Sequence, residues 1–291
     1  MGNKIAIVVD SSSGIYNGTY PDVFTIPLII QEITNGRNFT YKDQIDITPE
    51  EISKKLLAGS NIKTASSIPG DIMEFLNKIC DKYEQVFVFP CPTTVSGAYN
   101  VWKMVIEMND YKNVKLFKNP MLAAPAEWIV RDLIEARNKN ILNEQFVNKY
   151  LEQHDNRFQV DILVPDAKYV HRGGRVKGLT ALIVAILGIS VVFTQTDKAA
   201  KKFGQTFTLK KGIKMVACDV FKEMIAQSPL HRIKRVGLFT NKACDPKFDS
   251  EKYLTLVKNY FKNFKYEIFQ LTPVIYGQIG PNYVGVAMEV E

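Results

Sequence analysis

The sequence lacks the short motifs that identify the commonest nucleotide-binding and metal-dependent enzymes. Its 291 residues contain no GxxxxGK[ST] phosphate loop, no GxGxxG after the first apolar run and no HExxH zinc motif. The 4 cysteines include no CxxC pair and follow no regular framework; they are Cys80, Cys91, Cys218 and Cys244. We therefore expect no metal, no cofactor and no disulfide scaffold, with the thiols reduced.

Long apolar runs and concentrated charge are missing as well. The chain is 46% hydrophobic and 23% charged, with a formal net charge of +7, which is typical of a soluble globular protein. The basic residues form no stripe interleaved with aromatics, so nucleic-acid binding is not expected. The apolar segment 179–193 is shorter than the ~18–20 residues of a spanning helix, and the run at 5–9 ends at Asp10, as a strand does. We expect a cytoplasmic protein without a transmembrane segment.

Strand-like and helix-like segments alternate through the first half of the chain. Apolar runs at 5–9, 23–30, 85–90 and 114–117 are typical of strands, and amphipathic helical patterns stand between and after the later ones. Thr48, followed by a proline and two glutamates, marks the start of one helix. Alternation at this spacing indicates a parallel sheet with helices on both faces.

The second half has a different pattern, and a polar stretch at 138–158 separates it from the first. Its strands and helices, including a long helix near 212–228, indicate a mixed sheet. Its last run, 284–291, has the period of a half-buried strand. We therefore predict an α/β fold of two domains, an N-terminal α/β domain at 1–157 with a parallel sheet and a C-terminal α+β domain at 158–291.

Two loops rich in hydroxyl groups stand directly before predicted helices. They are KTASSIPGD at 63–71 and PCPTTVSGAYN at 90–100. Such hydroxyls ordinarily only cap helices. The first turn of a helix also exposes N–H groups, so Ser96 Oγ with the amides of Gly97 and Ala98 could hold an anion without a cation. At the carboxyl ends of neighbouring parallel strands, both loops would converge on one crevice.

An enzyme built around Ser96 is an alternative interpretation. Ser96 follows a predicted strand and opens a helix, as a nucleophile elbow does, but Thr94 and Ala98 stand where that motif requires glycines. The 3 histidines are His154, His171 and His231. Nothing in the sequence places one of them beside Ser96 as a general base.

The segment HRGGRVKG at 171–178 combines glycines with several cations. Arg172 or Arg175 could contact an anion or a protein partner. A solvated turn, with its cations near the start of a helix, explains the same pattern. The charge alone does not decide between these interpretations.

Five segments together resemble the DegV family, in the family's order and over nearly the whole chain. They are IVVDSSSGI, KTASSIPG, PTTVSGAYN, HRGGRV and GPNYVGVAM. The resemblance implies two α/β domains with a fatty acid in a pocket between or within them. It also implies a binding subunit that presents the fatty acid to a separate kinase, which makes an acyl phosphate.

The resemblance also implies roles for individual residues. Thr64 and Ser96 would bind the carboxylate of the fatty acid, and the amides of Gly97 and Ala98 would assist. Near the C-terminus, Gln278 stands where the family usually has a histidine, so this position can donate a hydrogen bond but carries no charge.

The sequence departs from the family pattern at two further positions near Thr64, and two arginines belong to the expected site. Ala65 replaces the serine that usually follows Thr64 in the family, and Gly70 follows Pro69. Arg172 and Arg175 would meet the kinase or its phosphate. No catalytic residue and no metal ligand are expected.

The leading hypothesis is a non-catalytic carrier of a long-chain fatty acid such as palmitate. Burying about 14 methylenes at roughly 0.8 kcal/mol each gives on the order of 11 kcal/mol, so the tail dominates affinity and the hydroxyls set orientation. The alternative is an α/β enzyme that acts on a small anionic or acyl substrate with Ser96 as nucleophile. A third hypothesis is an interaction module whose basic surface makes transient contact with membranes.

Overall fold

The computed structural model describes residues 4–173, 189–227 and 232–291. Its strands are β1 (Ile5–Asp10), β2 (Val23–Ile26), β3 (Ile29–Thr34), β4 (Arg37–Lys42), β5 (Asn61–Ala65), β6 (Gln85–Phe89), β7 (Val114–Leu116), β8 (Phe158–Val164), β9 (Ser190–Thr196), β10 (Ala200–Thr206), β11 (Ile233–Thr240), β12 (Tyr266–Phe269) and β13 (Val284–Val290). Its α-helices are α1 (Pro49–Leu57), α2 (Pro69–Ile79), α3 (Ala98–Met108), α4 (Ala123–Asn138), α5 (Glu144–Gln153), α6 (Ala167–Gly173), α7 (Leu209–Lys214), α8 (Val220–Gln227), α9 (Ser250–Tyr260) and α10 (Pro273–Ile279). The 3-10 helices η1 (Ser11–Ser13) and η2 (Cys80–Lys82) and the π-helical η4 (Met215–Asp219) complete the described elements.

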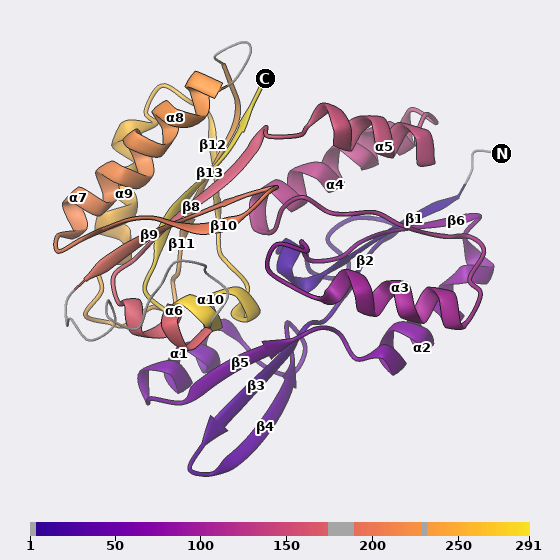
Figure 1. The fold of residues 1–291 in the computed structure, drawn as a ribbon, viewed down its shortest axis with the longest axis horizontal. Coiled ribbons are helices and arrows are strands. Elements are labelled where there is room, and N and C mark those ends of the chain that lie inside the picture. Colours follow the sequence, from indigo (N-terminus) through magenta and orange to yellow (C-terminus); the bar gives the residue numbers. More distant parts are fainter. Residues whose placement is uncertain (1–3, 174–188, 228–231) are drawn as a thin grey trace.

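The described strands form three sheets. One has the order β2-β1-β6-β7 with parallel neighbours, and another has the order β10-β9-β8-β13-β11-β12 with mixed directions. The third, β4-β3-β5, is antiparallel. Figure 1 shows the two larger sheets beside each other, with the β3–β4 hairpin projecting away from both. The predicted α/β class is confirmed, with a parallel sheet in the first half and a mixed sheet in the second.

Helices cover both faces of the parallel sheet. Ala6 and Val8 of β1 belong to a buried cluster with side chains of α2 and α3. Ile5 and Ile7, which point the other way, belong to a cluster with α4 side chains such as Trp128. Every residue of β1 is buried because both of its faces are covered.

The six-stranded sheet is also covered on both faces, which overturns one prediction. All residues of β13 are buried, so its interpretation as a half-buried strand was wrong. Val286 belongs to the cluster formed with α7 and α9 on the outer face, visible in Figure 1, whereas Ala287 belongs to the cluster shared with α4. Glu289 has no solvent exposure and instead pairs with Lys234 and Arg235.

The antiparallel sheet was not predicted. The run 23–30, predicted as one strand, divides at Pro27 into β2 and β3, and proline cannot donate to a sheet ladder. β3 then turns back into β4 through Asn35 and Gly36, whose φ values of 47° and 71° suit a two-residue hairpin turn. Residues 63–65, predicted as part of a loop, pair with β3 as strand β5.

Other segments differ from prediction in detail. The long helix predicted near 212–228 consists of α7, η4 and α8, and β10 and α10 were not predicted. The apolar segment 179–193 lies mostly outside the described residues, but its end from 190 belongs to β9. None of the helices in the described part of the chain combines the length and apolar character that a membrane span requires.

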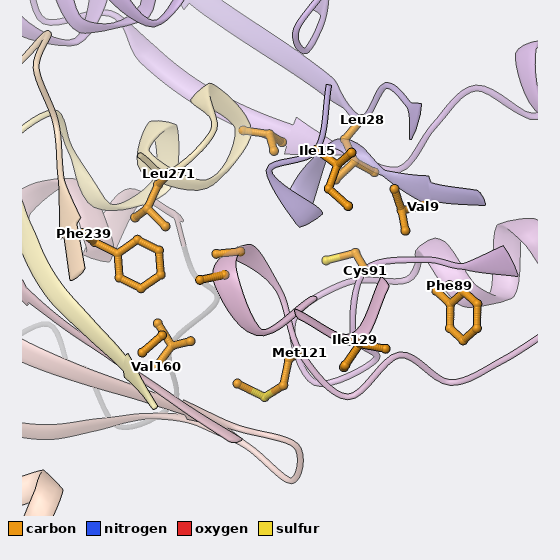
Figure 2. Packing of buried hydrophobic residues seen from close by; sticks show 14 of the residues in the cluster. Val9, Ile15, Leu28, Phe89, Cys91, Met121, Ile129, Val160, Phe239 and Leu271 are labelled. Atoms are coloured by element: carbon orange, nitrogen blue, oxygen red, sulfur yellow. The ribbon is translucent and has the colours of Figure 1, made fainter. Parts of the chain in front are cut away.

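The largest hydrophobic cluster joins the two halves of the chain. It contains buried side chains of β1 and β6 together with those of β8, β9 and β11. In Figure 2, Val160 and Phe239 of the six-stranded sheet lie at one side of this cluster and Phe89 at the other, with Met121 between them in this view. The division at residues 157 and 158 stays a prediction, since core side chains are shared across it.

Candidate ligand-binding site

A cavity of about 440 Å³ is lined by elements associated with all three sheets. Its walls come from the loops after β1 and β6, from β5 and α10, and from β8, β9 and β10. Its lining side chains are mostly apolar, and its polar lining consists of hydroxyls, two glutamine amides and the cationic Lys201. The volume falls within the range of about 300–1,000 Å³ that is usual for small-molecule sites.

Thr64 and Gln278 lie together on this cavity wall. Gln278 Nε2 donates a hydrogen bond to Thr64 Oγ1 at 3.2 Å, which joins α10 to β5. A Cβ on Gly277 would lie 3.0 Å from Ile62 Cγ2, so the missing side chain lets α10 approach β5 closely. Because β5 pairs with β3 in an antiparallel ladder, Thr64 lies on an antiparallel strand, and not at the carboxyl end of a parallel strand as we predicted.

Ser96 lines the same cavity and lies in the loop that follows β6. Its amide donates to the carbonyl of Pro92, and its Oγ accepts the N–H of Ala98 at 3.1 Å. Ser96 and Gly97 line the cavity. Because Ser96 Oγ accepts from Ala98, its own O–H is oriented to donate elsewhere. The Ala98 amide already donates to Ser96 Oγ, so its role is to support the Ser96 side chain.

A buried carboxylate that sequence reasoning missed holds the loops behind the cavity. Asp10, at the end of β1, accepts hydrogen bonds from the amide and hydroxyl of Ser12 and from the amide of Cys91. Ser12 and Cys91 both line the cavity. Burial raises the pKa of Asp10 to about 6, against the lowering effect of these hydrogen bonds. An aspartate that ends the first strand and precedes three serines was the available signal.

The opposite wall is one face of the six-stranded sheet. Val160 and Ile162 of β8 alternate with residues that face the outer helices, and Phe193 pairs with Ile162 across the ladder. Gln195 follows on the same face of β9. All four line the cavity. Sequence reasoning gave no signal for these residues, because the pairing of β8 with β9 joins distant segments.

Of Arg172 and Arg175, only the first belongs to a described element. Arg172 lies in α6, near the end of that helix. Arg175 lies outside the described residues. Their predicted roles stay predictions.

His154 belongs to a separate ion-pair cluster. Its Nδ1 lies 2.7 Å from the carbonyl oxygen of Tyr150, and its Nε2 lies 3.6 Å from Glu289 Oε1. Asp132, His154 and Glu289 lie close enough to hold a metal ion. Arg235 pairs with both carboxylates and Lys234 pairs with Glu289, so these carboxylates already have cationic partners. His154 does not line the cavity that contains Ser96.

Comparison with known proteins identifies the family. Residues 4–291 match the model of the DegV family, whose description reads "Uncharacterised protein, DegV family". The chain belongs to the DegV family. A DegV domain-containing protein of Mycoplasma pneumoniae is 25% identical over 239 residues, which cover 80% of this chain and 79% of that protein. One of Caldanaerobacter subterraneus is 26% identical over 216 residues, covering 73% and 75%.

Solved structures of DegV proteins share the fold. A fatty-acid-binding DegV family protein from Streptococcus agalactiae has a TM-score of 0.81 with 19% sequence identity, covering 99% of both chains. A DegV protein from Thermus thermophilus, described by its fatty acid binding, has a TM-score of 0.80 at 19% identity, covering 99% of this chain and 100% of that one. A DegV protein from Eubacterium eligens, loaded with heptadecanoic acid, has a TM-score of 0.74 at 14% identity with the same coverage.

Proposed function

We propose that this DegV protein binds one long-chain fatty acid, such as palmitate, in the cavity described above. Thr64 and Ser96 hold the carboxylate, the Gly97 amide assists, and Gln278 positions Thr64. The observation that carries the proposal is that a hydroxyl from β5 and one from the loop after β6 line a mainly apolar cavity of about 440 Å³. A DegV protein of Streptococcus agalactiae described as fatty acid binding and one of Eubacterium eligens loaded with heptadecanoic acid support the same assignment.

The chemistry of the walls suits such a ligand. A fatty acid needs a long apolar surface for its tail and directed donors for one carboxylate, because a buried charge without hydrogen bonds is costly. Ser96 can donate its O–H while accepting from Ala98. Thr64 Oγ1 accepts from Gln278 Nε2, which positions the Thr64 hydroxyl on the cavity wall. A neutral clamp is sufficient where the tail supplies most of the affinity.

The protein would act as a carrier and not as an enzyme. We propose that it presents the bound acid in the cytoplasm to a separate fatty acid kinase, with Arg172 and Arg175 contacting the kinase or its phosphate. Two facts weigh against Ser96 as a nucleophile: its Oγ caps the Ala98 amide, and His154 lies in another cluster. No cofactor has a role in this proposal.

Organic extraction of the purified protein, followed by mass spectrometry, tests the function. We expect one acid with a chain of roughly C14 to C18 per protein, since such tails bury enough methylenes to dominate binding. Protein that is folded but empty, and that takes up no acid of this length, would contradict the proposal. Labelling of Ser96 by an acyl-enzyme probe would instead favour the enzyme hypothesis.

A further inference from the structure

Gln195 is a polar side chain with apolar neighbours on one face of the six-stranded sheet. Its register partners are Val160 on β8 and Ala200 on β10, and Phe193 shares its face along β9. All four residues line the cavity. Only 7% of Gln195 is exposed, so its amide lies inside the apolar wall and not in solvent.

The orientation of this amide is fixed by two backbone carbonyls. Gln195 Nε2 lies 3.4 Å from the carbonyl oxygen of Pro120 and 3.5 Å from that of Thr196, and it donates to both. A reversed amide would place Oε1 against these two acceptors. Oε1 therefore faces away from them, and it is buried without a hydrogen-bond donor. Such atoms are rare in folded proteins because an unsatisfied buried acceptor is unfavourable.

A water molecule is a poor partner for Oε1 at this place. Buried waters ordinarily make about three hydrogen bonds. The nearest side chains to Gln195 on its face, by register and along the strand, are those of Val160, Phe193 and Ala200, and these three offer no hydrogen bond. The donor that suits Oε1 is therefore one that arrives with the ligand.

We propose that the cavity selects a long-chain acid that carries a hydroxyl group on its chain, and that Gln195 Oε1 accepts the hydrogen bond from this hydroxyl. The inference rests on the proposed function, since the acyl chain brings the hydroxyl to the wall. A plain chain leaves Oε1 unsatisfied, whereas a hydroxylated chain satisfies it. Gln195 is thus a specificity residue, and Thr64 and Ser96 hold the carboxylate in either case.

Competition binding tests this selectivity. Labelled palmitate is displaced from the wild-type protein by unlabelled palmitate or by monohydroxy palmitates that carry the hydroxyl at successive chain positions. At least one positional isomer should bind about threefold to tenfold more tightly than palmitate, the gain expected from one net hydrogen bond. The positional series is needed because the distance along the chain selects the isomer.

Two matched variants isolate the side chain. Gln195→Met keeps the length of the side chain and removes the acceptor, so it should abolish the preference while binding palmitate at least as tightly as the wild type. Gln205→Met makes the same change at an exposed position of β10 and should retain the preference.

The outcomes separate this proposal from the function on which it rests. Palmitate binding without preference for any isomer would overturn the role of Gln195 and leave fatty-acid binding intact. A preference that survives Gln195→Met would do the same. Failure to bind any acid, hydroxylated or plain, would overturn both.

Discussion

Replacement of Asp43 by asparagine should stabilise the protein at neutral pH and reduce the pH dependence of its stability. Asp43 has 0% solvent exposure, just beyond β4. Burial raises the pKa of its carboxyl from 3.8 to about 7; donors including the Ser11 hydroxyl oppose this rise, and the charge of Asp10 adds to it. The carboxyl is therefore costly to ionise in the folded state.

The sign of the effect follows from this raised pKa. The folded protein holds the proton more tightly than the unfolded chain, so the contribution of Asp43 is fully present below about pH 4 and is lost as pH rises toward about 7. A rise of about 3 pKa units corresponds to a loss of about 4 kcal/mol in the free energy of unfolding. Asparagine stays neutral, so Asp43→Asn should gain up to about 4 kcal/mol over the wild type near pH 8 and little near pH 4.

Urea unfolding between about pH 4 and about pH 8 measures this difference directly. Asp110→Asn is a matched control, because this carboxylate is 74% exposed and its removal should change the free energy of unfolding by less than about 0.5 kcal/mol. If the stability curves of Asp43→Asn and the wild type run parallel across this range, the reasoning about the buried carboxyl is refuted.

Three further substitutions test the site and its support. Thr64→Val combined with Ser96→Ala should weaken palmitate binding by about 1–3 kcal/mol in calorimetric titration, because the carboxylate loses its hydroxyl donors; unchanged affinity would place the carboxylate elsewhere. Gly277→Val should lower the free energy of unfolding by about 1–3 kcal/mol and also weaken palmitate binding, since the new side chain presses on Ile62; a variant of normal stability and affinity would disprove that close approach. Thr48→Ala should remove about 1 kcal/mol of stability, measured by urea unfolding, without changing palmitate affinity, because it removes only the capping box of α1.

Local sequence patterns predicted much of the fold, because a helix cap or a buried strand depends mainly on residues that are close together in the sequence. Thr48 caps the start of α1 as expected, and the apolar run at 85–90 forms the buried strand β6. The burial of β13 was not predicted, because its Glu289 becomes compatible with a covered face only through ion pairs with residues of β11. Alternation of apolar and polar residues along a strand shows which side chains share a face of the sheet, but not which elements cover that face.

The candidate site was predictable in part. The hydroxyl loops directed attention to Thr64 and Ser96, and the structure brings both to one cavity, although Thr64 arrives on an antiparallel strand that the sequence reasoning missed. The positions of Asp10 and Gln195 at the site could not be predicted, because they depend on contacts between segments that are distant in the sequence. The partner of Asp10 at Cys91 is 81 residues away, and the Gln195 contact with Pro120 spans 75 residues. Such contacts follow from sheet order and register, which local patterns do not determine.

A crystal structure of the protein with palmitate tests the central claim most directly. The account predicts one acid in the cavity, with its carboxylate oxygens within about 3.2 Å of Thr64 Oγ1 and Ser96 Oγ and its tail against the face of β8 and β9. A carboxylate bound away from both hydroxyls, or a palmitate found only outside this cavity, would contradict the account.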